Sequence, residues 1–366
     1  MDETLELPTL DLADVSSTDP ARQERASRAI LEGFGRYGLL YVKGHEVPPV
    51  APLYDQFAAF CARGTEAKQP FNRADIWYQR GWTPPNTERA VIAGGQPDFK
   101  ECWFAAPIEL DPECVDEFPE VCSANVWPED APEFREWTLR VGRELHLAGV
   151  ALLRQAARAL ELESETFARL CEGAPHVFRL LKYLPLEREQ IEGGVLWGEE
   201  HTDFNLLTLL PGGQFFDPDG RRGPAPDSQS GLYLRTRPSA EFPKGQRIRP
   251  NPPAGCLVAQ VGQELEILTG GKLTATPHEV TAPKTPGWSR FSAAHFVHLH
   301  PRAVLSPLRP FRSKEALRAY SPPTLAGTYA QKTLVDIGLA PSNALDALGY
   351  RHYDRLVEQR AEGPSS

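Results

Sequence analysis

The chain has 366 residues, of which 41% are hydrophobic, so it is long enough and apolar enough to bury a large core. Its formal net charge of −10 argues against nucleic acid or an anionic membrane as a partner, because both favour clustered lysine and arginine. No apolar run approaches the length of a membrane span, and the acidic N-terminus lacks the apolar core of a signal peptide. The six cysteines form no CxxC pair, which favours reduced thiols. We therefore expect a cytoplasmic protein with no obligate protein partner.

The N-terminal part, residues 1–175, has the pattern of a helical support region. A short strand is expected within residues 7–12, and Asp19, followed by proline, gives a good N-cap for the first helix. A second strand is expected at 38–43 and a second helix at 50–63.

Two further segments of this part differ in character. Residues 71–107 are rich in aromatic residues and are expected to form loops that could roof a cavity. Residues 130–162 carry apolar residues at the i, i+3, i+4 spacing of a helix that faces the core, and this should be the longest helix.

From residue 176 the pattern changes to short apolar runs separated by turns, which is typical of a jelly-roll sandwich or barrel. The expected strands lie at 177–184, 206–210, 231–237, 256–261, 272–281 and 290–299, with surface excursions at 212–230 and 238–253 and helices at 313–319, 324–335 and 343–360. We expect one domain over 1–366, with a jelly-roll core at 176–302 and C-terminal helices at 303–366.

A histidine and a carboxylate two positions apart, His201 and Asp203, stand before an apolar run of strand type. On a strand, residues i and i+2 point to the same face, so the two side chains could bind one small ligand. Such a pair arises often by chance, so a third ligand is required. His278 lies in another strand-like run. Two histidines and one carboxylate can occupy one face of an octahedral metal and leave open positions that suit Fe(II) oxygen chemistry.

Arg290 and Ser292 follow His278 and share one strand face. An arginine fork with a hydroxyl is suited to holding a carboxylate, and a buried arginine without an acidic neighbour requires an anion. The pattern therefore predicts a metal with an acid bound beside it. His295, His298 and His300 form a rival cluster, for which a strand end leaving the core is the favoured interpretation; their roles stay open.

The motifs H-T-D, T-P-H and R-F-S, in this order on a jelly-roll pattern, resemble those of the Fe(II)/2-oxoglutarate dioxygenases of the isopenicillin N synthase-like superfamily. The resemblance spans nearly the whole chain and implies a double-stranded β-helix (jelly-roll) with packed helices. It implies that His201, Asp203 and His278 ligate Fe(II), that Arg290 and Ser292 hold the far carboxylate of 2-oxoglutarate, and that O2 takes the remaining site. The implied activity is oxidation, by default hydroxylation, of a small organic substrate such as an amino acid or a specialised metabolite, with release of succinate and CO2.

Within this superfamily, the stretches G-Q-P-D-F, G-L-Y-L and L-T-G-G-K-L are similar to the bacterial ethylene-forming enzyme. This resemblance implies that Arg179 contacts a carboxylate of the co-substrate or the substrate, and it places Phe204 in the substrate pocket where that enzyme has tyrosine. Tyr183 is a further candidate contact for the co-substrate. Val91 and Ala93 stand where that enzyme binds arginine, so the resemblance does not extend to arginine binding or ethylene formation.

Two alternatives remain open. An oxidase of the isopenicillin N synthase type would use Arg290 and Ser292 to hold the carboxylate of its own substrate and would need no 2-oxoglutarate. A non-catalytic jelly-roll module would bind an acidic metabolite without consuming oxygen. Release of succinate on turnover distinguishes the proposed dioxygenase from both.

Overall fold

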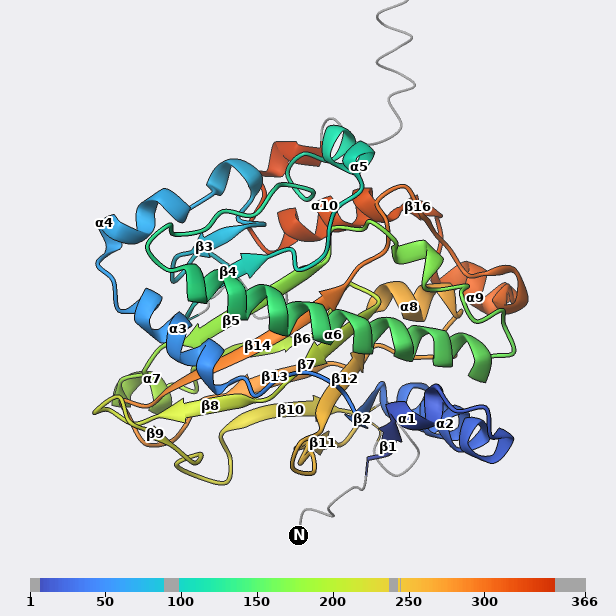
Figure 1. Ribbon diagram of the computed structural model, residues 1–366, viewed down its shortest axis with the longest axis horizontal. Helices are drawn as coiled ribbons and strands as arrows, with labels where there is room; N and C mark the ends of the chain where they lie inside the picture. Colours follow the sequence, from blue (N-terminus) through green and yellow to red (C-terminus); the bar gives the residue numbers. More distant parts are fainter. Residues whose placement is uncertain (1–6, 89–98, 237–242, 244, 346–366) are drawn as a thin grey trace, which may run out of the picture.

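Two β-sheets face each other in the computed structural model, which describes residues 7–88, 99–236, 243 and 245–345 (Figure 1). The larger sheet has ten strands. Its main path runs in the order β1 (Thr9–Asp11), β2 (Leu39–Lys43), β12 (Leu257–Val261), β7 (Leu207–Leu210), β14 (Ser289–Val297), β5 (Val177–Tyr183), β4 (Lys100–Ala105) and β3 (Gly81–Thr83). β8 (Gly213–Phe216) pairs with β14, and β9 (Arg222–Gly223) pairs with β8.

The smaller sheet has four strands, in the order β11 (Arg247–Ile248), β10 (Gly231–Arg235), β13 (His278–Thr281) and β6 (Gly198–His201). Side chains of both sheets pack together between them, since Leu181 of β5 and Val280 of β13 belong to one buried apolar cluster. This is the jelly-roll core that the strand spacing predicts, so the expected fold class is confirmed. A separate two-stranded sheet joins β15 (Val304–Leu305) to β16 (Thr324–Leu325).

The long helix α6 (Pro132–Ala159) packs against β7 and β14 on the outer face of the larger sheet and is drawn across that sheet in Figure 1. Its apolar stripe is buried, as the periodicity predicts. The approach of this helix is close because Gly149 has no side chain: a Cβ there would lie 2.9 Å from Val297 and 3.0 Å from Leu209. The backbone of α6 therefore lies very close to β7 and β14.

Shorter helices complete the outer layer. They are α1 (Leu12–Val15), α2 (Pro20–Glu32), α3 (Ala51–Cys61), α4 (Thr65–Lys68), α5 (Pro112–Glu117), α7 (Arg188–Glu192), α8 (Gln263–Leu268), α9 (Lys314–Ala319) and α10 (Ala326–Asp336). Asp19 caps α2 as expected, because its carboxylate accepts a hydrogen bond from the Ala21 amide at 2.9 Å. Within the described ranges, no helix is both long enough and apolar enough to cross a membrane.

The structure corrects several expected element bounds. The segment 71–107 contains β3 and β4, which the sequence pattern missed because five of the six residues of β4 are buried, so no alternation of polar and apolar residues marks it. The expected strand at 272–281 begins only at His278. The excursion 212–230 contains β8 and β9, and the excursion 238–253 contains β11. Most of the expected helix at 343–360 lies outside the described residues.

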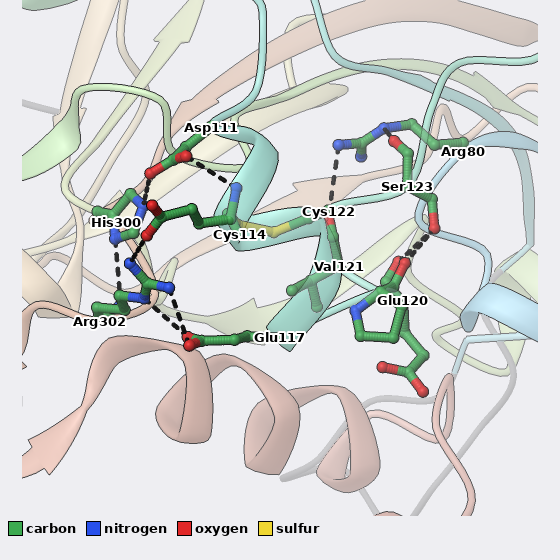
Figure 2. The surroundings of a disulfide bond; sticks show 12 residues. Arg80, Asp111, Cys114, Glu117, Glu120, Val121, Cys122, Ser123, His300 and Arg302 are labelled. Carbon is green, nitrogen blue, oxygen red and sulfur yellow. Dashed lines mark hydrogen bonds and ion pairs between the residues drawn. A yellow bond between two sulfur atoms is a disulfide. The ribbon is translucent and has the colours of Figure 1, made fainter.

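The expectation of six reduced thiols is wrong for two of them. Cys114 and Cys122 form a disulfide with an S–S distance of 2.01 Å (Figure 2). Both are fully buried, and Cys61, Cys102, Cys171 and Cys256 remain thiols. No sequence motif marks a pair eight positions apart, so the pairing depends on the path of the chain around α5.

Polar contacts lie on both sides of residues 114–122, the segment that the disulfide closes. On one side, Arg302 forms ion pairs with Glu113 and Glu117 (Figure 2). On the other side, the buried guanidinium of Arg80 donates to the backbone carbonyl of Ser123 at 2.9 Å. The disulfide therefore belongs to a polar framework around α5.

Candidate metal centre

The structure brings together the three predicted ligands, His201, Asp203 and His278, with one ligand atom of each within 4.8 Å of the others. His201 ends β6 and His278 begins β13, and the two residues are directly opposite each other in the antiparallel pair. Oδ1 of Asp203 lies 3.7 Å from Nε2 of His201 and 3.8 Å from Nε2 of His278.

The sequence pattern explained only in part why His201, Asp203 and His278 lie together. Asp203 lies beyond the end of β6 and not on one strand with His201, so strand parity does not join them. A turn carries the carboxylate toward the two imidazoles. The cross-strand pairing of His201 with His278 brings the third ligand to the same place. No spacing in the sequence reveals this pairing.

The other polar atom of each side chain is anchored by the protein. Nδ1 of His201 lies 2.7 Å from the carbonyl oxygen of Glu199, and Oδ2 of Asp203 accepts a hydrogen bond from the Thr208 hydroxyl at 2.6 Å. Nδ1 of His278 lies 3.2 Å from the side-chain amide of Gln260. Such outer contacts orient metal ligands, and here they direct two Nε2 atoms and one carboxylate oxygen toward one point.

Electrostatics favour a neutral imidazole at His201. Desolvation and the nearby His278 lower the pKa of His201 to about 4, while Asp203 offsets part of that shift. The His201 side chain is 52% exposed, but the His278 ring centroid lies only 4.3 Å away, and this neighbour alone disfavours a second positive charge. Neutral nitrogen donors beside a carboxylate fit a divalent metal such as Fe(II).

Arg290, which is predicted to hold a carboxylate, lies at the start of β14. Arg290 is directly opposite Tyr183 of β5, and its guanidinium carbon lies 5.5 Å from the Tyr183 ring and 5.9 Å from the Phe215 ring. Ser292, two residues on, is buried. None of the ion pairs between the described residues involves Arg290.

Gly213 of β8 makes room for that guanidinium. It stands opposite Ser292, and a Cβ at this position would lie only 2.5 Å from Nη2 of Arg290. No motif in the sequence marks this glycine, because the contact depends on how β8 pairs with β14.

Arg179, predicted to contact a carboxylate, has a protein partner. Its Nη2 lies 2.5 Å from the Glu88 carboxylate, which also accepts from Lys100 at 2.9 Å. Burial alone would raise the pKa of Glu88, but these two cations lower it to about 2. Nε of Arg179 is buried without a hydrogen-bond partner in the described part of the chain. The predicted contact between Arg179 and a ligand carboxylate therefore stays a prediction. In the structure the guanidinium already pairs with the carboxylate of Glu88.

The remaining candidates lie in separate surroundings. Phe204 lies 5.0 Å from His298, ring centroid to centroid, and burial together with Arg80 lowers the pKa of His298 to about 3. His300 contacts Asp111 at 3.1 Å. The interpretation of a strand end leaving the core is wrong for His295, which is fully buried in β14.

Both halves of the chain are similar to known proteins. Residues 7–130 match the N-terminal family described as "non-haem dioxygenase in morphine synthesis", and residues 176–299 match the 2OG-Fe(II) oxygenase superfamily. The chain is 26% identical to the proline hydroxylase buaE of Petromyces alliaceus, over 80% of this chain and 87% of that protein. It is 27% identical to the validamycin A dioxygenase of Streptomyces hygroscopicus subsp. limoneus, over 82% of this chain and 79% of that protein.

Among solved structures, a full-length Neurospora crassa protein in complex with alpha-KG is similar with a TM-score of 0.72 and 22% identity, over 92% of this chain and 98% of that one. This likeness shows a shared fold. The narrower similarity to ethylene-forming enzyme rests on the sequence stretches alone and stays a prediction.

Proposed function

The chain belongs to the 2OG-Fe(II) oxygenase superfamily, and from that premise we propose that His201, Asp203 and His278 hold Fe(II) while Arg290 and Ser292 hold the far carboxylate of 2-oxoglutarate. The protein is an Fe(II)- and 2-oxoglutarate-dependent dioxygenase that oxidises a small molecule. The observation that carries the site assignment is the convergence of two imidazole nitrogens and one carboxylate oxygen within 4.8 Å.

The donor set fits the metal. Oxidation of the substrate by O2, coupled to conversion of 2-oxoglutarate to succinate and CO2, is the chemistry that the iron centre supplies when it is bound. The anchored Nδ1 of His201 leaves Nε2 free to bind, and Thr208 leaves Oδ1 of Asp203 free. With His201, Asp203 and His278 as its three protein ligands, a bound Fe(II) would keep further positions available to the keto acid and to O2.

Arg290 and its neighbours orient the co-substrate. The guanidinium lies beside the rings of Tyr183 and Phe215, which exclude water from a bound carboxylate and so strengthen the charged hydrogen bonds. The Ser292 hydroxyl lies on the same strand face and can donate to the same carboxylate. In this proposal Tyr183 is a packing contact of the co-substrate.

The substrate is small, and we propose an amino acid or a specialised metabolite. Support comes from two relatives, one named a proline hydroxylase and the other a validamycin A dioxygenase. Phe204 is proposed to line the substrate pocket, and Arg179 to contact a carboxylate of substrate or co-substrate. We also propose that residues 1–366 act as one domain without an obligate protein partner, and in the cytoplasm.

The decisive experiment is an anaerobic titration of the Fe(II)-loaded protein with 2-oxoglutarate, followed by visible absorption. A saturable weak charge-transfer band is expected, and admission of O2 with a competent substrate should release succinate. Iron binding without such a band would favour the oxidase of the isopenicillin N synthase type. Ligand binding without oxygen consumption would favour a non-catalytic binder.

A further inference from the structure

Gln260 of β12 is buried at 2% exposure next to the candidate metal centre, and its side-chain oxygen has no hydrogen-bond partner within the described residues. Its amide nitrogen lies 3.2 Å from Nδ1 of His278. A buried amide oxygen without a donor is costly in an apolar interior, so this residue requires an explanation.

The position of Gln260 in the larger sheet places it beneath the ligands. It is directly opposite Thr208 of β7, so the two side chains are cross-strand neighbours on one face. Thr208 bonds Asp203, and Gln260 reaches His278. Two adjacent polar side chains of the larger sheet thus support two ligands, one from a turn and one from the smaller sheet.

The hydrogen atoms around His278 decide which end of the Gln260 amide faces the ring. Nδ1 of His278 also lies 3.4 Å from the carbonyl oxygen of Thr276, which can only accept. Nε2 is the nitrogen that faces Asp203, so a His278 that binds the metal through Nε2 carries its ring proton on Nδ1. An amide NH2 group pointed at that Nδ1–H would oppose one donor to another. Rotation of the amide by 180° exchanges its oxygen and nitrogen and turns the unpartnered oxygen toward the N–H.

We propose that Gln260 is a positioning residue for the metal: its side-chain oxygen accepts the Nδ1–H of His278 and thereby presents Nε2 to Fe(II). The contact repeats for His278 what the Glu199 carbonyl does for His201. A metal-bound histidine is usually fixed in this way, by an acceptor on its second nitrogen that sets the tautomer and raises the basicity of the ligating atom. This inference rests on the proposed function, because it takes His278 as a ligand.

The test compares two substitutions of Gln260 by titration of the metal-free protein with Co(II), followed by visible absorption. Gln260→Met keeps the shape but removes the acceptor, so Co(II) should bind about 10- to 100-fold more weakly. Gln260→Glu keeps an acceptor, so its Co(II) affinity should equal or exceed that of the wild type. A merely structural role predicts the reverse order, because methionine suits a buried site and a new carboxylate does not.

Gln155→Met is the matched control. Gln155 is a fully buried glutamine of α6 that bonds Ser27, remote in the chain from the ligands, and its replacement should leave Co(II) affinity unchanged. Wild-type affinity in Gln260→Met, or equal losses in Gln260→Met and Gln260→Glu with the metal-free unfolding temperatures unchanged, would overturn the proposal. Failure of the wild-type protein itself to bind Co(II) would instead contradict the proposed function.

A measurement on the unmodified chain keeps the proposal open to test if a variant does not fold. In the metal-free protein, the nitrogen chemical shifts of the His278 ring should show the proton on Nδ1, the tautomer that the Gln260 oxygen and the Thr276 carbonyl require. A ring protonated on Nε2, with the Gln260 amide as the donor, would overturn the inference whatever the metal titrations give.

Discussion

At the scale of single residues, the position of the Arg290 guanidinium depends on the missing side chain of Gly213. The guanidinium of Arg290 occupies the space where a Cβ of Gly213 would stand, at 2.5 Å from Nη2. The atom that would have to move is the far end of a flexible side chain, so a small substitution should displace the guanidinium and leave the strand pairing in place. Binding and stability can therefore be separated at this position.

Gly213→Ala should weaken 2-oxoglutarate binding while changing the free energy of unfolding little. Arg290→Ala should weaken binding more, by about 10-fold to 150-fold, since hydrogen bonds to a charged group contribute about 1.5–3 kcal/mol. Both effects are measured by the anaerobic titration with 2-oxoglutarate, with urea unfolding as the stability control. Unchanged 2-oxoglutarate affinity in Arg290→Ala would remove this residue from the co-substrate site.

The types and order of the site residues could be predicted from the sequence, but their supports could not. His201, Asp203 and His278 stand out because ligand chemistry restricts residue type. Gln260 and Glu88 are ordinary polar residues, and their roles depend on strand register and on a loop path, which a single sequence does not encode in any local spacing.

At the scale of elements, α6 lies so close to the larger sheet that Gly149 has no room for a side chain. A Cβ there would lie 2.9 Å from Val297 and 3.0 Å from Leu209, and both neighbours belong to strands that pack on α6. Unlike Gly213, this glycine is enclosed by packed core side chains, so relief would require the helix or the strands to shift.

Gly149→Val should lower the free energy of unfolding by about 1–3 kcal/mol, because overpacking a filled core forces strained rotamers or a backbone shift. Equilibrium unfolding in urea measures this change. Gly64→Val is the control, since no atom lies within 4 Å of the position its Cβ would take. Equal stability of the two variants would contradict the close approach of α6.

A buried histidine cluster joins α6 to β14. Nδ1 of His146 lies 3.3 Å from Nε2 of His295, and the ring of His176 lies 4.3 Å from that of His146, centroid to centroid. Burial lowers the pKa of His146 to about 4, and burial with the neighbouring imidazoles lowers the pKa values of His176 and His295 well below the ordinary range. The three imidazoles are therefore uncharged in the folded protein at neutral pH.

Acid should destabilise the protein through this cluster. Below about pH 6.5 a histidine in the unfolded chain takes up a proton that the buried histidine of the folded chain does not. The free energy of unfolding should therefore decrease as the pH is lowered from about 6.5 to about 4. The slope is about 1.4 kcal/mol per pH unit for each such histidine. Urea unfolding of the metal-free protein at several pH values measures it, and His146→Leu should make the slope shallower. Stability that does not vary over this range would show that the histidines are not buried in the neutral form.

At the scale of the whole molecule, the candidate site draws on both sheets. The smaller sheet contributes His201 and His278, while the larger sheet contributes Thr208, Gln260 and Arg290. A metal bound by His201, Asp203 and His278 would hold β6, β13 and the turn after β6 together as well as serve the chemistry, so binding and stability should be linked.

Addition of Mn(II) or Co(II) to the metal-free protein should therefore raise its free energy of unfolding, by about 2.7 kcal/mol when the free metal is 100-fold above the dissociation constant. Thermal unfolding with and without metal measures the effect. His278→Ala should show no such increase, because it removes one of three ligands. Equal stabilisation of that variant would mean that the metal binds elsewhere.

The overall architecture, like the candidate site, was predictable from the sequence only in part. The jelly-roll and the long helix follow from apolar periodicity, because burial imposes a period on the residues of one face. β3 and β4, which extend the larger sheet beyond β5, did not follow from periodicity, since strands covered on both faces lose that period. The disulfide likewise depends on the path of the chain after α5, which brings Cys114 and Cys122 together although no local motif marks the pair.

The pairing of β6 with β13 has a practical consequence for protein engineering. His201 and Asp203 lie before the segment 224–229, and His278, Gln260 and Arg290 lie after it, so a cut there would leave each fragment with an incomplete ligand set. Only reassociated fragments could restore the metal site. The colour of bound Co(II) would then measure the pairing of β6 with β13, and the jelly-roll could act as a split reporter that is read by a metal ion.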